Sequence, residues 1–328
     1  MRAREIDIIR AFVVIALVAY HSLAPYAGGW QPITDGASFF DYVYKWLGHF
    51  AYAGMLETFT AISGFVFGLV ECKKSATLKV LVSKKLRRLY VPALIWGLIY
   101  YILFVNESYG TGLWRIINGI GHLWYLPMLF WCFILEKYIF RKSPIWIIIL
   151  IAVIPWPELP LQFNNSLYYL LFFHIGYLIS EYKHQFINYL NLKRCTIILM
   201  MAISILVAST IWRDNLDLPL MSKMIKAVHI FAIRFLRILY SVPIVLAYFY
   251  LGFRLRNTRY YNIFLFLSEC SFGVYILQEF IIRILYYKLD IPNSIETIIP
   301  FIGFCGGFLG SLLIVWCCRR FKVANLIF

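Results

Sequence analysis

The chain has 328 residues, of which 62% are hydrophobic and only 14% are charged, whereas an ordinary soluble domain has about 25% charged residues. This composition excludes a soluble globular domain and predicts a polytopic integral membrane protein. Several apolar runs are long enough to cross the roughly 30 Å hydrocarbon layer as helices. The net charge of +15 is then explained by membrane topology, and we expect no nucleic-acid partner.

The apolar runs predict an all-α bundle of about ten transmembrane helices, near residues 6–27, 47–70, 89–105, 123–140, 144–157, 166–182, 195–212, 225–252, 261–285 and 296–318. The run 144–157 is short and rich in proline, and Pro243 lies where it can kink the long run 225–252. The longest connections, 28–46 and 71–88, are too short to form cores of their own. We therefore expect residues 1–328 to form a single transmembrane domain.

The basic residues cluster in alternate connections of this bundle. Of the 31 Lys and Arg residues, 22 lie near residues 2–10, 73–88, 137–142, 183–194, 254–259 and 319–322. The positive-inside rule places these segments, and both termini, in the cytoplasm. The first apolar run has no convincing cleavage site, so we expect it to be a retained helix. The seven cysteines show no spacing typical of metal ligands, and no metal is expected.

The first apolar run carries two polar side chains, Arg10 and His21. Eleven residues are close to a whole number of helical turns, so the two lie on one face, separated by roughly 16 Å along the axis. Arg10 alone is typical of a membrane-surface anchor, and His21 alone of a histidine bonded to a neighbouring helix. Together they indicate a site, because an arginine can bind a phosphate and a neutral imidazole can take a proton from a hydroxyl.

Other polar residues in the apolar runs are more ambiguous. Glu57 is expected near the middle of the second helix, where it must be paired, protonated or facing water. The segment 84–92 reads as a basic loop containing Arg87 and Arg88, which suits either phosphate binding or contact with anionic lipid headgroups. His122 and Trp124 open the fourth helix on the outer side, where aromatic residues suit a membrane interface or a platform for a sugar ring.

Three further groups have structural explanations that are at least as good as functional ones. Glu279 and Arg283 form a favourable i,i+4 pair on the ninth run. The eighth run carries His229, Arg234 and Arg237, and His174 between apolar neighbours is read as a core histidine.

Five segments, in order, resemble the motifs of the acyltransferase 3 family of membrane acyltransferases. They are Ile6-Asp7-Ile8-Ile9-Arg10 with His21-Ser22, Phe59-Thr60-Ala61-Ile62-Ser63-Gly64-Phe65, Arg87-Arg88-Leu89-Tyr90-Val91-Pro92, His122-Leu123-Trp124-Tyr125-Leu126-Pro127, and Leu267-Ser268-Glu269-Cys270-Ser271-Phe272-Gly273-Val274-Tyr275-Ile276-Leu277. The set covers nearly the whole chain. Two departures stand out: Gln278-Glu279 follow where the family usually has histidine, and Thr58-Phe59 replace its usual paired aromatics.

The resemblance implies about ten helices and transfer of an acyl group, usually acetyl, from cytoplasmic acyl-CoA to a sugar hydroxyl of a surface polysaccharide or lipid-linked glycan. It gives His21 the role of general base and gives Arg10, Arg87 and Arg88 a part in binding the donor. Glu57, His122 and Trp124 are the candidates for binding the acceptor. The expected partners are acyl-CoA, the glycan acceptor and membrane lipids, and the expected location is the inner membrane of a bacterium.

Two other functions remain open at this stage. A transporter or exporter of a glycan or lipid-linked sugar would have pseudo-symmetric halves with broken helices, which the sequence does not display. A non-catalytic partner in a glycan-assembly complex would leave Arg10 and His21 dispensable. The sequence favours the enzyme.

Overall fold

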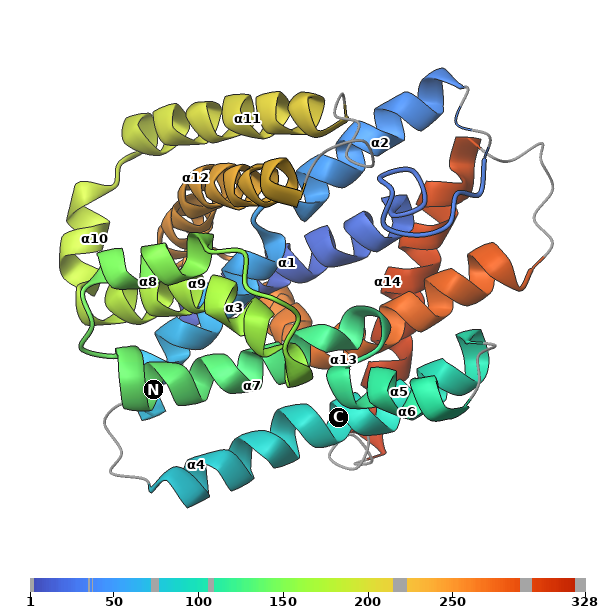
Figure 1. Ribbon diagram of the computed structural model, residues 1–328, viewed down its shortest axis with the longest axis horizontal. Helices are drawn as coiled ribbons and strands as arrows, with labels where there is room; N and C mark the ends of the chain where they lie inside the picture. Colours follow the sequence, from blue (N-terminus) through green and yellow to red (C-terminus); the bar gives the residue numbers. More distant parts are fainter. Residues whose placement is uncertain are drawn as a thin grey trace. The chain divides into compact units, whose positions relative to one another are not determined.

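The computed structural model describes residues 3–34, 36, 38–71, 77–105, 109–214, 223–289 and 297–321, and every regular element within them is a helix (Figure 1). Eight helical stretches in this part of the chain are long and apolar enough to cross a membrane: Arg4–Leu23, Phe39–Val70, Leu78–Phe104, Gly121–Phe140, Leu192–Asp214, Ala227–Leu255, Tyr261–Tyr287 and Ile299–Arg320. The protein is a multi-pass integral membrane protein with an all-helical fold. Four predicted cytoplasmic basic residues lie outside the described ranges: Arg2, Lys73, Lys74 and Lys322.

Two of the ten predicted spans form helices that are not among these eight stretches. Helix α8 (Ile145–Val153) has nine residues, which extend only about 14 Å and cannot cross the hydrocarbon layer alone. Helix α9 (Phe163–Glu181) has 19 residues but contains two asparagines, several tyrosines and His174. Its residues from Ser166 to Tyr177 are all buried, so α9 is an interior helix.

The chain divides into two compact units. Unit 1 comprises Met1–Met55 and Arg254–Phe328, and its helices are α1 (Arg4–Leu23), α2 (Phe39–Tyr52), α13 (Tyr261–Tyr287) and α14 (Ile299–Arg320). Helix α1 packs against the other three. Tyr261 contacts Asp7 near the start of α1 and Tyr286 contacts Ser22 near its end, so α1 and α13 run parallel.

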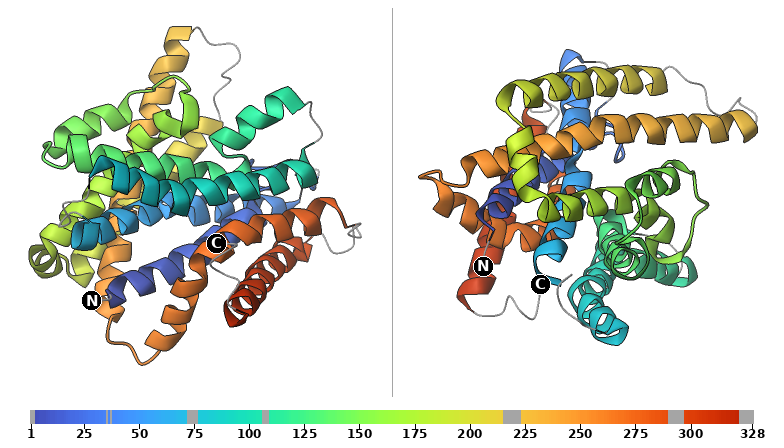
Figure 2. Two further views of the ribbon diagram at one scale, coloured as in Figure 1. Left: turned by 90° about the horizontal axis from the view of Figure 1, so that it is seen from below. Right: turned by 90° about the vertical axis from the view of Figure 1, so that its left-hand side faces the viewer.

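Unit 2 comprises Leu56–Phe253. Its elements, in order, are α3 (Met55–Val66), η1 (Phe67–Glu71), α4 (Leu78–Lys85), η2 (Leu86–Tyr90), α5 (Val91–Phe104), α6 (Tyr109–Asn118), η3 (Gly121–Trp124), α7 (Tyr125–Leu135), η4 (Glu136–Phe140), α8, η5 (Pro160–Gln162), α9, α10 (Lys183–Tyr189), α11 (Leu192–Asp214) and α12 (Lys223–Leu255). Helix α12 continues through Pro243. Helices α11 and α12 lie side by side as a hairpin (Figure 2), with the rings of Trp212 and His229 4.9 Å apart.

The predicted second helix, 47–70, is in fact two helices with different bounds. Helix α2 begins at Phe39, inside the expected connection 28–46, because Ser38 and Asp41 form a capping box with hydrogen bonds of 3.0 and 3.1 Å. It ends at Tyr52, and Gly54 adopts a φ of +67°, which glycine tolerates best. Helix α3 then starts at Met55. The expectation of one continuous helix was therefore wrong.

Helices α3 and α9 approach each other until their backbones touch. A Cβ added at Gly64 would lie 1.8 Å from the carbonyl oxygen of Phe173, and one added at Gly176 would lie 1.9 Å from that of Ala61. Only glycine fits at either position, since contacts this short do not occur between real Cβ and oxygen atoms. This close packing fixes α3 against the interior helix of unit 2.

Candidate functional site

Arg10 and His21 lie on the same face of α1, as their spacing predicts. Helix α1 is uninterrupted over its 20 residues, and both side chains contact α13. The Arg10 Nη1 donates to Ser268 Oγ at 3.3 Å, and His21 Nδ1 lies 2.7 Å from Gln278 Nε2. The two contacts on α13 are ten residues apart, close to the eleven that separate Arg10 from His21, because the helices run parallel.

His21 is held by side chains on three sides. It is only 6% exposed, and its Nε2 lies 3.5 Å from Glu279 Oε2. The other oxygen of Glu279 accepts a 2.8 Å hydrogen bond from Arg283 Nε, which confirms the predicted i,i+4 pair. The ring of Trp30 stacks on the imidazole with centroids 5.6 Å apart, and the Arg283 guanidinium lies 4.3 Å from the Trp30 centroid. A proton accepted by this imidazole would create a cation beside a carboxylate, which suits a general base.

The start of α1 holds a second polar cluster, around Asp7. This buried carboxylate accepts hydrogen bonds from Ser268 Oγ at 2.8 Å and from Tyr261 OH at 2.7 Å. Ser268 in turn accepts from Arg10, and the guanidinium of Arg4 lies 4.9 Å from the Tyr261 ring. Asp7 therefore helps to orient Arg10 through Ser268. The sequence shows that Asp7 lies near Arg10, because it is three residues earlier on the same helix. It does not show that Ser268 and Tyr261 of α13 contact Asp7.

Glu57 lies in the first turn of α3 rather than in the middle of a helix, because of the break at Gly54. There the positive end of the helix dipole favours its carboxylate. Its side chain is fully buried, and its Oε1 lies 2.8 Å from both Nε and Nη2 of Arg237. Tyr168 OH donates to the same oxygen at 3.1 Å. Arg237 Nη2 also donates to Tyr169 OH at 3.0 Å, so a partly buried ion pair is joined to two tyrosines of α9.

Trp124 belongs to the same cluster, whereas His122 packs elsewhere. The Trp124 ring lies 5.8 Å from the Tyr169 ring, so Glu57 and Trp124 are linked through Arg237 and Tyr169. His122 is buried in η3, two residues earlier, with its ring 6.4 Å from that of Tyr100 on α5. Of the three candidate acceptor residues, the structure groups Glu57 with Trp124 and places His122 against α5.

The basic segment 84–92 is helical, so the expectation of a loop was wrong. It contains the π-helical turn η2, in which the Val91 N–H bonds to the Leu86 carbonyl five residues earlier. Pro92 has no N–H for an ordinary helical bond, and single π turns of this kind are frequent at functional sites. The turn joins α4 to α5 without ending the helix.

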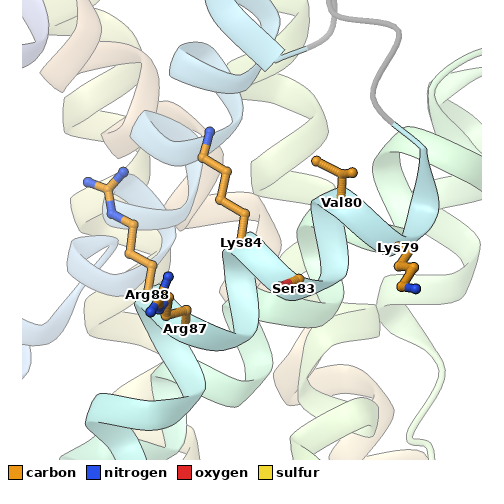
Figure 3. Close-up of a pocket in the computed structure, with 6 residues that line it drawn as sticks. All are labelled: Lys79, Val80, Ser83, Lys84, Arg87 and Arg88. Carbon is orange, nitrogen blue, oxygen red and sulfur yellow. The ribbon is translucent and has the colours of Figure 1, made fainter.

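Arg87 and Arg88 line a surface depression of about 520 Å³ on α4 and η2, together with Lys79, Val80, Ser83 and Lys84 (Figure 3). The side chains of Lys84 and Arg88 extend to the same side of the helix, as expected for residues four apart. Four cations and a hydroxyl at one depression suit an anionic ligand such as a phosphate group.

Two further polar residues of unit 2, His174 and Arg234, form structural contacts. His174 Nδ1 lies 2.9 Å from Glu136 Oε1, and both side chains are buried, so the reading of His174 as a core histidine is confirmed. Arg234 donates to the carbonyl oxygen of Ile154. Among the described residues, no three His, Cys, Asp or Glu side chains are arranged as metal ligands.

No curated protein and no solved structure matches the chain. The sequence model of one family, described as an acyltransferase domain, matches residues 4–320. This span includes the polar clusters at both ends of α1, the contact between α3 and α9, the basic depression and the aromatic cluster around Trp124. The chain therefore belongs to the acyltransferase 3 family and is a multi-pass membrane acyltransferase.

Proposed function

We propose that this acyltransferase moves an acyl group, in the first instance acetyl, from cytoplasmic acyl-CoA to a sugar hydroxyl of a surface polysaccharide or lipid-linked glycan in a bacterial inner membrane. The observation that carries the proposal is the buried imidazole of His21, which lies between Gln278 and Glu279 on the α1 face that also carries Arg10. A titratable base inside a membrane bundle lowers stability, so its presence there favours a functional role.

The proposed reaction needs one base and no other protein nucleophile. His21 takes the proton of the sugar hydroxyl as its oxygen attacks the thioester carbonyl carbon. The new C–O bond forms, the C–S bond breaks, and the proton passes from the imidazolium to the departing CoA sulfur. The products are the sugar ester and free CoA. Glu279, 3.5 Å from the ring, would stabilise the imidazolium while it exists, and the bilayer would keep water from competing for the thioester.

The donor offers anionic groups that match the basic side chains of each unit. Coenzyme A carries a diphosphate and a further phosphate, and arginine binds phosphate in a bidentate manner. In unit 1, Arg10 is oriented by Ser268 and Asp7. In unit 2, Arg87 and Arg88 line the basic depression with two lysines. We propose these three arginines as donor-binding residues.

The acceptor is proposed to bind at the Trp124 cluster of unit 2. Aromatic faces such as those of Trp124 and Tyr169 pack against the C–H faces of sugar rings, and the neighbouring Arg237–Glu57 pair supplies polar groups for the hydroxyls. His122, two residues from Trp124, is kept as a third candidate. Arg237 and Tyr169 join this set because of their contacts. The sequence showed Arg237 only as one of the charges of the eighth apolar run and gave no signal for Tyr169.

The proposal is tested by transfer of radiolabelled acetyl groups from acetyl-CoA to extracted surface glycan. Purified wild type, His21→Ala and His184→Ala would be compared in liposomes. His184 is an exposed histidine of α10 and serves as the matched control. Label reaching the glycan with wild type and His184→Ala, but not with a folded His21→Ala, supports a base at His21.

Two other results contradict parts of the proposal. Equal labelling by wild type and His21→Ala removes His21 from the mechanism and moves attention to Glu57 and His122. Absence of labelling by the wild type shows that the acyl group or the acceptor is wrong. In that case, movement of unlabelled glycan across the liposome membrane would support the transporter alternative.

A further inference from the structure

Gln278 contacts His21, but the reaction proposed above gives it no role. Its side chain is fully buried on α13, and one end of its carboxamide lies 2.7 Å from His21 Nδ1. The other end, Oε1, is buried without a hydrogen-bond partner among the described residues. A buried amide that is half satisfied lowers stability, so its presence beside a histidine indicates a functional position rather than simple packing.

The 2.7 Å contact decides which nitrogen of His21 is able to act as a base. A neutral imidazole carries one proton, and the nitrogen without it accepts the substrate's proton. Gln278 occupies Nδ1, and the contact of Nε2 with Glu279 Oε2 is longer, at 3.5 Å. A hydroxyl group can therefore reach Nε2 more readily than Nδ1.

Base catalysis through Nε2 requires the proton of the neutral ring to sit on Nδ1. The structure places the carboxamide nitrogen of Gln278 at Nδ1, and a half rotation of the carboxamide places its oxygen there instead. With the oxygen facing Nδ1, it accepts the Nδ1–H bond and leaves the Nε2 lone pair for the substrate. With the nitrogen facing Nδ1, the ring proton lies on Nε2 and points to Glu279. The lone pair then lies on Nδ1, where it accepts the Gln278 N–H and does not face a substrate hydroxyl.

The same orientation also suits the imidazolium formed during the reaction. Both of its nitrogens are donors, so Nδ1–H needs an acceptor as much as in the neutral base. The Gln278 oxygen supplies that acceptor without adding a charge, while Glu279 supplies the negative charge near Nε2. Arg283 holds the other oxygen of Glu279 at 2.8 Å, which fixes the carboxylate on its side of the ring.

We infer that Gln278 is a positioning residue of the acyl transfer, whose carboxamide oxygen accepts the Nδ1–H of His21 and so keeps Nε2 as the base nitrogen. The inference rests on the proposed role of His21. It does not require Gln278 to touch either substrate, because its effect passes through the imidazole.

Two substitutions of similar size separate positioning from packing. Gln278→Glu keeps an oxygen acceptor facing Nδ1, whereas Gln278→Met fills the same volume without any acceptor. If Gln278 positions His21, Gln278→Met lowers kcat by about 100-fold, in the range expected when general-base catalysis is lost. Gln278→Glu then retains kcat within about tenfold of wild type, and the KM for acetyl-CoA in both variants stays within about threefold.

A packing role gives the opposite order. The apolar Gln278→Met would keep nearly full kcat, and Gln278→Glu would be impaired because it buries an additional charge beside Glu279. That result overturns the inference. Should Gln278→Met not yield folded protein, the test rests on Gln278→Glu: a folded enzyme that keeps its kcat supports positioning, and a folded enzyme without activity overturns it.

His21→Ala, measured in the same series, distinguishes failure of the inference from failure of the proposed function. If His21→Ala is inactive while Gln278→Met turns over like wild type, only the positioning role is wrong. If His21→Ala is as active as wild type, the proposed base is wrong, and the positioning role is refuted with it.

Discussion

Substitution of Gly64 by alanine tests the contact that fixes α3 against α9. The added Cβ would lie 1.8 Å from the Phe173 carbonyl oxygen, whereas distances under 3.0 Å essentially do not occur. The helices would have to separate by about 1.2 Å or more, and overpacking of this kind costs about 1–3 kcal/mol. The obstructing atom belongs to the backbone, so no side-chain rotation relieves it. We expect a cost at the upper end of this range.

The expected loss is measurable as a shift in thermal unfolding of the detergent-solubilised protein. A cost of about 2–3 kcal/mol corresponds to a decrease in Tm of roughly 5–10 °C for a unit of this size. Gly97→Ala is the matched control, because its Cβ would meet Ile116 at 3.4 Å, an ordinary contact. Alanine also favours a helix over glycine by about 1 kcal/mol, so Gly97→Ala should leave Tm unchanged or raise it slightly.

The double variant gives a sharper test of the same contact. Gly176→Ala places a Cβ 1.9 Å from the Ala61 carbonyl oxygen on the opposite side of the α3 and α9 interface. The separation forced by Gly64→Ala makes room for the second methyl group, so the double variant should lose less than the sum of the single losses. Equal Tm values for Gly64→Ala and Gly97→Ala would refute the close approach, and strict additivity would refute the shared interface.

Three further predictions concern the proposed binding residues. Lys84→Gln combined with Arg88→Gln should raise the KM for acetyl-CoA by about tenfold at low salt and by less at high salt, because added salt screens exposed charges. Steady-state kinetics at two salt concentrations measure this effect, and an unchanged KM would argue against a donor site at the basic depression. Trp124→Ala should raise the KM for the glycan without changing that for acetyl-CoA, and the reverse pattern would contradict an acceptor site. Glu57→Gln should lower the free energy of unfolding by about 3 kcal/mol, since it removes the carboxylate that neutralises Arg237. The double variant with Arg237→Gln should regain part of the lost Tm, and a further decrease in Tm would show that the pair is not coupled.

The sequence was informative where one helix alone determines the geometry. Arg10 and His21 share a face because of the helical period, and Glu279 and Arg283 pair because they are four residues apart. Membrane class also followed directly, since apolar runs of sufficient length have few alternatives to spanning a bilayer as helices. The family resemblance rested on the order of several such local motifs, and the match over residues 4–320 bears it out.

Local signals failed at points where a few residues change the course of the backbone. The break at Gly54 moved Glu57 from the expected middle of a helix to the first turn of another, and Ser38 started a helix inside an expected connection. Pro92 made segment 84–92 resemble a loop, although a single π turn accommodates it within a continuous helix. Hydropathy averages over many residues and does not register such positions.

The sequence by itself determined that the protein is a helical membrane acyltransferase with Arg10 and His21 on one helix face. Only the tertiary structure decided what those residues touch: Ser268 beside Arg10, Gln278 and Glu279 beside His21, and Arg237 beside Glu57, 180 residues away along the chain. The physical reason is that helical periodicity relates residues within one helix, whereas contacts between helices depend on how whole helices pack, which leaves no period in the sequence.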